Sequence, residues 1–487
     1  MPWSYKDDLA CEAGGVREEK NRQTGRAYAS RRKPWIDNFT CRATLTAMFQ
    51  QGRRQLNKSI LSALTASLIA ISAGTTLAAD VKVIHAGELL AVPGSAPMKN
   101  QTIVVEDGRI KEVRGGFVDA SEFGEDAVRI DLSNSFVMPG MMDMHVHIQG
   151  ELSANSDSET LRLSAADVGM KSVLFANRTL MAGFTTVRDL GAEPTHLYAL
   201  RDASAKGWLG APRIIASGGV AATGGHGDVD GMRHDLLEKY TSKTICDGPY
   251  DCRRAVRRAV KFGADVIKIT ATGGVLSDTN TGTGQQMTND ELQEIMDTAH
   301  GLGRKVAAHA HSAGGINAAL RAGVDSIEHG SYADKESIKL FKKTGAYLVP
   351  TLLAGDTVVN MAKTSNFMSD QIKAKAIRVG GDMMEHFTVA YKAGVNIAFG
   401  TDSGVSRHGN NAQEALLMEK AGMTRMDVLK SATVNAADLI NMSEQLGTIE
   451  AGKFADIIAT DGNALADLNE LLDVDFVMKN GEVYKNK

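Results

Sequence analysis

Residues 305–331 read KVAAHAHSAGGINAALRAGVDSIEHGS and contain two short apolar runs that each end in histidine. Short apolar runs bounded by turn-forming residues are typical of buried strands. The same form recurs in FTTVRDL (184–190), PRIIASG (212–218), ADVIKITATGG (264–274), AYLVPTL (346–352) and NIAFGTDSG (396–404). Helical segments separate these runs, and one begins at Thr288, where Glu291 fits a capping box. Repeated strand–loop–helix units over residues 139–442 predict an α/β fold, a parallel (β/α)8 barrel of the TIM type.

A doubly wound open sheet is the rival arrangement of such units. Neither of its common phosphate-binding signatures, GxGxxG and GxxxxGK[ST], is present at the first strand. The barrel is therefore the favoured fold.

Both ends of the chain beyond the barrel segment have the texture of β-strands. Residues 81–140 hold three β-rich runs, and Asp107-Gly108 between two of them predicts a hairpin turn. Residues 447–485 look alike, with a second turn at Asn480-Gly481. We therefore expect residues 80–138 and 443–487 to form one small β-sandwich domain, into which the barrel (139–442) is inserted.

The amino-terminal region does not resemble folded enzyme. Arg53, Arg54 and Lys58 precede an apolar run from about Ile60 to Ala73, and small residues follow to Ala78 and Ala79. This order predicts a secretory signal peptide over residues 48–79, with a membrane anchor or a buried helix as alternatives. Residues 1–47 would then be an extension that is disordered or not made, with Met48 as the start. The predicted location is the periplasm or the exterior, with no stable membrane anchor.

Cysteine usage and net charge narrow the choice further. Cys246 and Cys252 are the only cysteines after the predicted signal, and they could form a disulfide in an oxidising compartment or remain unpaired thiols. The formal net charge of −4 argues against nucleic acid as a partner, because no strong basic field is present to attract phosphates.

Metal-competent side chains follow the predicted strands at their carboxyl ends. His145 and His147 in PGMMDMHVHIQG are spaced to share one face of a strand, although an HxH pair alone is a weak signal. Lys268 lies near the end of an apolar strand, where an unpaired ammonium would be costly. It could react with CO2 to give a carbamate that bridges two ions, pair with an acid, or extend to the rim.

The later strands continue this pattern. His309 is the first polar residue after the run VAA, His311 follows on the same face, and His329 ends the run DSIEH. Asp402 follows the last apolar run and could both bind a metal and accept a proton from attacking water. In a barrel, the carboxyl ends of all strands meet at one face, so these side chains are expected to converge.

The order HxH, Lys, His, His, Asp resembles the amidohydrolase superfamily across essentially the whole mature chain. TGGHGD (223–228), VIKITATGGV (266–275) and FGTDSGVSRHG (399–409) are similar to the subgroup of prolidases, Xaa-Arg/Lys carboxypeptidases and imidazolonepropionase-like proteins, near the ochratoxin-hydrolysing amidases. The late phrase GTIEAGKFADIIA (447–459) matches the point where such chains re-enter the small domain.

The resemblance implies a role for each matching residue. Two divalent ions, zinc by expectation, would be held by six side chains, with a hydroxide between the ions as the nucleophile and Asp402 passing the proton to the leaving amine. The more buried ion would take His145, His147 and Asp402, the more exposed ion would take His309 and His329, and carboxylated Lys268 would bridge the two.

Other residues are candidates for contact with the substrate. His226 lies in a glycine-rich loop and could bind the substrate or only order the loop. His311 and Tyr332 are placed to touch substrate, and Tyr332 could equally form a wall. His408, with Arg407, follows Asp402 in the last loop and could meet a carboxylate or be solvated.

The resulting prediction is a binuclear hydrolase of amide or peptide bonds, a dipeptidase or carboxypeptidase-like enzyme for Xaa-Xaa or N-acyl amino acid substrates, ochratoxin-type amides included. The same site could instead hydrolyse a cyclic amide, a lactone or a phosphotriester. A non-catalytic secreted metal-binding protein is the alternative from another class. The expected partner is a small molecule, and the subgroup implies a homo-oligomer.

Overall fold

The computed structural model describes residues 79–191, 193–277 and 282–487. Contacts divide the chain into Met1–Thr76 and Leu77–Lys487, and only the second unit is treated below. The predicted extension (1–47) and the predicted signal peptide, apart from Ala79, lie outside the described residues.

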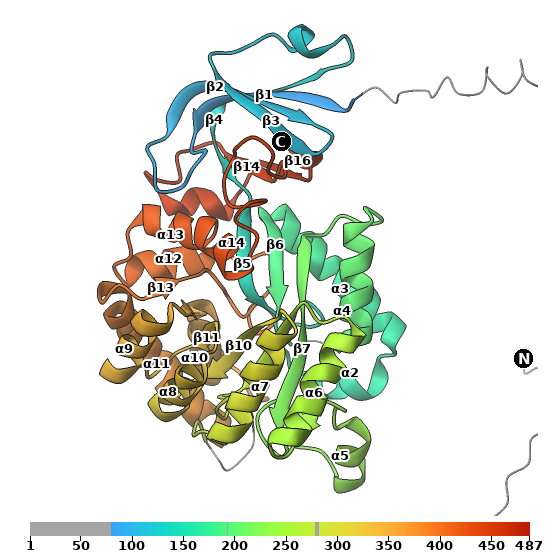
Figure 1. Ribbon diagram of the computed structural model, residues 1–487, viewed down its shortest axis with the longest axis vertical. Coiled ribbons are helices and arrows are strands. Elements are labelled where there is room, and N and C mark those ends of the chain that lie inside the picture. Colours follow the sequence, from blue (N-terminus) through green and yellow to red (C-terminus); the bar gives the residue numbers. More distant parts are fainter. Residues whose placement is uncertain (1–78, 192, 278–281) are drawn as a thin grey trace, which may run out of the picture. The chain divides into compact units, whose positions relative to one another are not determined.

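Eight parallel strands form the barrel, and they lie side by side in chain order (Figure 1). They are β5 (Met141–Val146), β6 (Phe184–Asp189), β7 (Arg213–Ala222), β9 (Val266–Thr270), β10 (Lys305–Ala310), β11 (Ser326–His329), β12 (Tyr347–Val349) and β13 (Asn396–Ile397). The segment after β13 closes the barrel onto β5, because Met144 N–H donates to Phe399 O (2.8 Å) and Asp402 N–H to His145 O (2.7 Å). The predicted (β/α)8 architecture is confirmed.

Helices connect these strands and cover the outside of the barrel (Figure 1). The longer ones are α3 (Ala165–Met181), α4 (Pro194–Ala205), α6 (Pro249–Phe262), α7 (Asn289–Gly301), α8 (Ala313–Ala322), α9 (Lys335–Thr344), α10 (Leu352–Thr364), α11 (Asp370–Lys392) and α12 (Gln413–Lys420). Shorter pieces are α2 (Ser156–Arg162), α5 (His234–Tyr240), α13 (Arg425–Ser431) and α14 (Val434–Leu439). The predicted capping box is present at the start of α7, since Glu291 N–H donates to the Thr288 hydroxyl and Thr288 N–H donates to the Glu291 carboxylate.

Strands from both ends of the described chain form a second sheet. Its seven members are β1 (Val81–Leu89), β2 (Met98–Glu106), β3 (Arg109–Gly115), β4 (Val128–Pro139), β14 (Ile457–Thr460), β15 (Phe476–Lys479) and β16 (Glu482–Asn486). Their order is β16-β15-β14-β4-β1-β2-β3, so β14 from the carboxyl end pairs with β4 from the amino end. The predicted small β-domain built from both ends, with the barrel inserted between them, is confirmed, and its strands form a single sheet.

The two predicted hairpin turns are confirmed. Asp107 and Gly108 have φ of 48° and 80°, and Asn480 and Gly481 have φ of 49° and 78°, which is the left-handed backbone of a type I′ turn. The turns pack together so closely that a Cβ on Gly481 would lie 2.6 Å from Gly108 Cα. Glycine at these two positions therefore allows the two turns, which come from opposite ends of the described chain, to pack against each other.

A disulfide links Cys246 to Cys252, as the spacing had suggested. It ties the short strand β8 (Ile245–Cys246), which pairs with the end of β7, to the first turn of α6. Within the described part of the chain, no helix combines the length and hydropathy needed to cross a bilayer.

Candidate metal and active site

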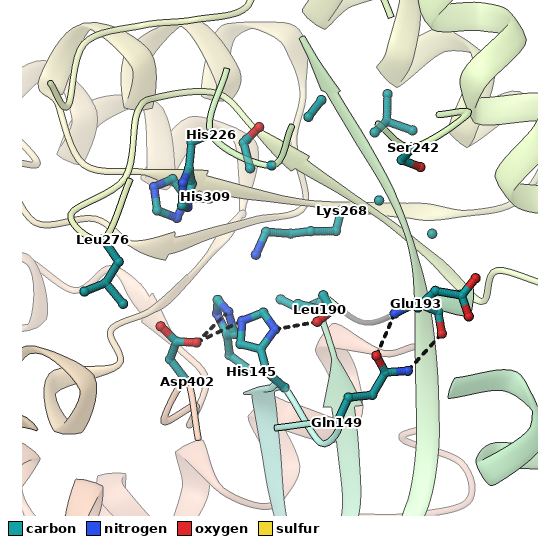
Figure 2. A pocket seen from close by; sticks show the side chains of 18 of the residues that line it. His145, Gln149, Leu190, Glu193, His226, Ser242, Lys268, Leu276, His309 and Asp402 are labelled. Carbon is teal, nitrogen blue, oxygen red and sulfur yellow. Dashed lines mark hydrogen bonds and ion pairs between the residues drawn. The ribbon is translucent and has the colours of Figure 1, made fainter. Parts of the chain in front are cut away.

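All six predicted metal ligands line one cavity of about 910 Å³ at the carboxyl ends of the barrel strands (Figure 2). His145 comes from β5, Lys268 from β9, His309 from β10 and His329 from the last position of β11. His147 follows β5 directly, and Asp402 lies in the segment after β13, five residues beyond its last residue Ile397. Figure 2 shows the Lys268 side chain between the His226–His309 pair and the His145–Asp402 pair.

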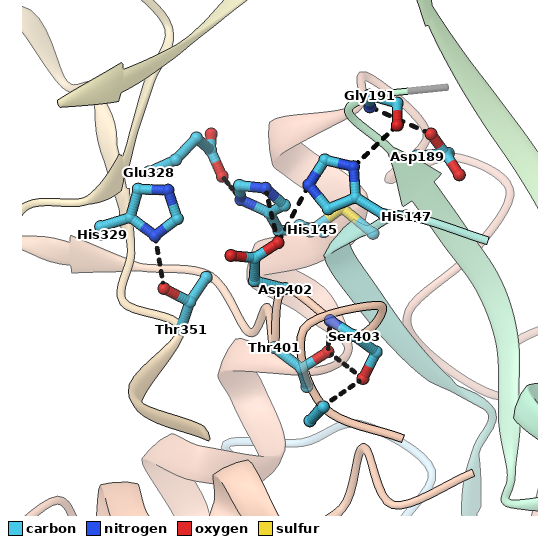
Figure 3. A network of polar contacts seen from close by, with 12 residues as sticks. His145, His147, Asp189, Gly191, Glu328, His329, Thr351, Thr401, Asp402 and Ser403 are labelled. Atoms are coloured by element: carbon cyan, nitrogen blue, oxygen red, sulfur yellow. Dashed lines mark hydrogen bonds and ion pairs between the residues drawn. The ribbon is translucent and has the colours of Figure 1, made fainter. Parts of the chain in front are cut away.

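Two of these residues have unusual backbone conformations. His329 has φ of 70° and Asp402 has φ of 56°, a left-handed conformation that is rare for residues other than glycine. Such backbone is found where surrounding structure holds it, often at functional sites. Here Asp402 N–H donates to His145 O, and the Asp402 side chain turns back toward the two histidines of β5 (Figure 3).

One nitrogen of His145 and one of His147 approach the same carboxylate oxygen of Asp402, and all three atoms are hydrogen-bond acceptors. His147 Nδ1 donates to Gly191 O (2.8 Å), because a carbonyl can only accept, so its Nε2 presents a lone pair when the ring is neutral. His145 Nδ1 lies 3.0 Å from Glu328 Oε2 and likewise leaves Nε2 as the acceptor. Asp402 Oδ1 lies 2.9 Å from His147 Nε2 and 3.5 Å from His145 Nε2. His145 Nε2 and Asp402 Oδ1 are buried and make no well-aligned hydrogen bond.

Lone pairs this close require a cation between them. Burial alone would lower the pKa of His147, but the Asp402 carboxylate raises it. A proton shared between His147 and Asp402 can therefore serve as the cation between their lone pairs. Burial would likewise raise the pKa of Asp402, and the charges of His145, His147 and Lys268 lower it. The donor set therefore fits a divalent metal ion, with each imidazole oriented through its other nitrogen.

A second group of possible ligands lies next to the first. Ligand atoms of His309, His311 and His329 lie within 4.8 Å of one another, and so do those of His145, His329 and Asp402. His329 is common to both groups. His311, predicted as a substrate contact, is thus also placed where it could bind metal.

Burial keeps these imidazoles in the neutral form that binds metals. It lowers the pKa of His145, His309 and His329 well below the ordinary value, and it lowers the pKa of His311 to about 3. His329 Nδ1 lies 2.7 Å from Thr351 Oγ1, and His311 Nδ1 lies 2.8 Å from Ser331 Oγ. The rings are therefore held in place from behind.

Lys268 is 7 % exposed, and no carboxylate in the described segments lies within ion-pair distance of its Nζ. Burial lowers the pKa of Lys268, against the attraction of Glu328 and Asp402. A lowered pKa increases the fraction of free amine, which is the form that reacts with CO2. The position is thus chemically suited to a carbamate.

Two buried acids support the ligands and were not predicted. Glu328 binds His145 Nδ1 through Oε2, while Oε1 accepts from Arg188 Nη2 (2.9 Å) and Ser326 Oγ (2.5 Å). Asp143 Oδ1 accepts from the N–H groups of His145 and Thr401, each at 3.1 Å. Asp143 therefore fixes the two strand ends that carry His145 and Asp402 relative to each other.

Both acids lie in sequence segments that also contain predicted ligands: Glu328 in SIEHG and Asp143 in PGMMDMHVH. The signal that could have found them is an acidic residue inside an apolar strand, one or two positions before a ligand. Burial raises the pKa of Asp143 to about 6, although its hydrogen bonds with Thr401 and Asn411 oppose the shift.

The predicted substrate contacts divide into two groups. His226 and His311 line the cavity, and the His226 ring centroid lies 4.4 Å from that of His309. Tyr332 and His408 do not line it. Tyr332 OH donates to Asp382 on α11 (3.0 Å), and His408 stacks on Phe175 with its Nε2 at 3.0 Å from Gly150 O. These two side chains are engaged elsewhere, so the structure does not bring them to the site.

Known proteins are similar to this chain over most of its length. The model of the Amidohydrolase family matches residues 136–484. Ochratoxinase from Aspergillus niger is 31% identical over 429 residues, covering 84% of this chain and 87% of that protein. Imidazolonepropionase from Fusobacterium nucleatum is 24% identical, covering 80% and 92%. A crystal structure of a Xaa-Pro dipeptidase with methionine bound in its active site is 38% identical, with a TM-score of 0.79, and covers 84% of this chain and 100% of that one.

Proposed function

This chain belongs to the amidohydrolase family and is a hydrolase of amide or peptide C–N bonds, and on that premise we propose that it is a dipeptidase or carboxypeptidase-like enzyme with two divalent metal ions. Its proposed substrates are Xaa-Xaa dipeptides and N-acyl amino acids, with ochratoxin-type amides within reach. Zinc is the proposed metal, and Lys268 is proposed to carry a CO2-derived carbamate between the two ions.

The convergence of lone pairs at Asp402 is the observation that carries the metal proposal. Asp402 Oδ1 lies 2.9 Å from His147 Nε2 and 3.5 Å from His145 Nε2, and each histidine is anchored through Nδ1. Nitrogen and carboxylate donors in this combination are typical zinc ligands. Burial lowers the pKa of Lys268 beside them, and no carboxylate of the described residues lies within ion-pair distance of its Nζ.

Hydrolysis requires water to add to the amide carbonyl and a proton to reach the leaving nitrogen. When bound, the metal ions would supply Lewis acidity for the carbonyl oxygen and for the attacking water. Asp402 is placed to take a proton from that water and pass it to the amine, so that a carboxylic acid and an amine leave. His226 lies beside His309 in the cavity wall, where its imidazole can hydrogen-bond a substrate oxygen.

The relatives support the substrate class. One matched protein is an ochratoxinase, and another is a Xaa-Pro dipeptidase whose crystal contains methionine in the active site. Both descriptions are consistent with an amide whose leaving group is an amino acid. The Cys246–Cys252 disulfide supports a periplasmic or secreted location, because such bonds persist in oxidising compartments. A homo-oligomer remains part of the proposal and can be measured by light scattering.

Replacement of Lys268 by alanine tests the metal arrangement. We expect Lys268→Ala to lose metal and hydrolysis of dipeptides together, because the ligand between the two ions is removed. Metal per chain is measured by elemental analysis of the purified protein, and kcat/KM is measured on the same sample. Lys261→Ala, at an exposed position of α6, is the matched control and should retain both. Retention of two ions per chain in Lys268→Ala would refute the bridging role.

A further inference from the structure

The cavity has two chemically different sides. One side is formed by the loop after β9, by α10 and α11, and by the loop after β13, and its side chains are Leu276, Ala354, Val358, Val379, Met383 and Val405. We call these six residues the apolar wall. The other side is mixed: it carries the polar and charged residues Gln149, Glu193, Ser242, Lys243 and Arg258 among aromatic and apolar ones that include Tyr198, Ile245 and Phe262. Figure 2 shows Leu276 on the same side of Lys268 as His226 and His309, and Ser242 on the opposite side.

Two glycines give the apolar wall its depth. Gly355 of α10 and Gly380 of α11 also line the cavity, at the point where these helices touch. A Cβ on Gly380 would lie 2.7 Å from Gly355 O, and a Cβ on Gly355 would lie 2.8 Å from Met383 Sδ. The helices can therefore pack closely, and no side chain from these two positions fills the space in front of Met383.

The charged residues of α10 and α11 near this wall are engaged in other directions. Lys375 Nζ donates to the backbone carbonyls of Gly274 (3.1 Å) and Ser277. Asp382 accepts from Tyr332 OH, and Asp356 accepts from Asn360 on the outer side of α10. A charged group placed against the apolar wall would thus lose hydration without gaining a partner, which is costly.

The apolar wall adjoins the residue that delivers the proton. Val405 follows Asp402 by three residues, and Val405 N–H donates to Asp402 O (3.0 Å). In amide hydrolysis the leaving nitrogen must lie next to the proton donor. Because Asp402 and Val405 line the same cavity, a substituent on that nitrogen can reach the apolar wall from Asp402.

Resting on the proposed function, we propose that the apolar wall binds the side chain of the leaving amino acid, and that this side chain is neutral and apolar. The substrate class is then N-acyl or peptidyl derivatives of amino acids such as leucine, methionine, valine and phenylalanine. Substrates with a lysine, arginine or glutamate leaving group are excluded. This separates the chain from the Arg/Lys carboxypeptidase branch of its relatives.

A substrate series tests the assignment. The zinc-loaded full protein is assayed with N-acetyl-X and Gly-X, where X is leucine, methionine, phenylalanine, lysine, arginine or glutamate. We expect kcat/KM for the apolar leaving groups to exceed that for the charged ones by about 100-fold, because a desolvated unpaired charge costs several kcal/mol. Equal or better hydrolysis of the lysine and arginine substrates would overturn the inference. Hydrolysis of none of the compounds by metal-loaded protein would instead refute the proposed function.

A second series, X-Leu with X varied, separates the two ends of the substrate. The assignment requires discrimination at the leaving residue. Strong selection for apolar X combined with indifference at the leaving residue would place the apolar wall on the acyl side, and so would contradict it.

A charge on the wall should invert the selectivity. Leu276→Glu lies in a half-buried loop position, so it is expected to lower kcat/KM for the leucine substrate at least about 10-fold and to raise it for the arginine substrate. Metal per chain should not change, because Leu276 is not one of the proposed ligands. Val389→Glu is the matched control, since Val389 is 50% exposed on the same helix as Met383 and lies outside the cavity.

A size variant covers the case in which the charge variant misfolds. Val358→Met narrows the same wall without adding charge and should reduce hydrolysis of the phenylalanine substrate more than that of the valine substrate. An unchanged order of substrates in both variants, with metal bound, would overturn the assignment.

Discussion

At the scale of single residues, the site depends on the predicted metal ligands and equally on the side chains that hydrogen-bond those ligands and hold them in position. Glu328 is fully buried and bonds both His145 Nδ1 and Arg188, so one carboxylate orients a ligand and neutralises a buried guanidinium. Groups of this kind fix the ring orientation of metal-bound histidines, and their loss typically lowers metal affinity 10- to 100-fold.

Replacement of Glu328 should therefore act through the metal. Glu328→Ala is expected to weaken zinc binding by roughly 10- to 100-fold and to lower the free energy of unfolding by about 3–5 kcal/mol, since Arg188 loses its buried partner. Zinc affinity is measured by competition with a chelator, and stability by urea unfolding. Glu328→Gln keeps an acceptor for His145 and should recover part of the affinity. Unchanged zinc affinity in both variants would show that Glu328 does not position His145.

The ligands were predicted from sequence, whereas the contact of Glu328 with His145 was not, and strand periodicity explains why. Adjacent residues of a strand point to opposite faces, so His329 in the cavity places Glu328 on the other face by simple alternation. The left-handed φ of 70° at His329 breaks this alternation at the strand end. Both neighbours can then serve the site, an outcome that no periodic pattern indicates. Tyr332 and His408 lie near ligands in the sequence, but their side chains bond to Asp382 and to Gly150 O and do not line the cavity.

At the scale of elements, each strand of the barrel matches a predicted apolar run. Both faces of such a strand are buried, so its sequence is a nearly continuous run of apolar residues. The loops were less predictable. The apolar wall needs α10 and α11 to meet at Gly355 and Gly380, and this contact joins residues of two helices with no common motif. The side of the cavity opposite the apolar wall includes the segment before α6, which the Cys246–Cys252 disulfide holds in place.

Loss of the disulfide should disturb substrate binding more than metal binding. Ser242, Thr244 and Ile245 line the cavity just before Cys246, whereas the predicted ligands come from other strands. We expect Cys246→Ser/Cys252→Ser to lower the free energy of unfolding by roughly 2 kcal/mol and to raise KM several-fold, with two zinc ions retained. Steady-state kinetics and metal analysis on the double variant measure this, with reduced wild-type protein as the comparison. A loss of zinc together with an unchanged KM would contradict it.

At the scale of the whole molecule, distant parts of the described chain meet in several places. Residues 397–403 close the barrel against β5, and β14 pairs with β4 in the second sheet. Arg213 of β7 also binds Asp456 (2.6 Å), which joins the barrel to the small sheet. Runs and turns predicted the strands and the two-domain plan, but these pairings link residues hundreds of positions apart. Sequence periodicity carries no information on them.

The central claim is that hydrolysis depends on two metal ions held by this barrel, and titration of metal-free protein with zinc tests it most directly. Bound zinc per chain and hydrolysis of an N-acyl leucine substrate are measured on the same samples. We predict negligible hydrolysis without metal and activity that saturates as zinc approaches two per chain, accompanied by a higher melting temperature because the ions bind the folded state. Full hydrolysis by the metal-free protein would contradict the account.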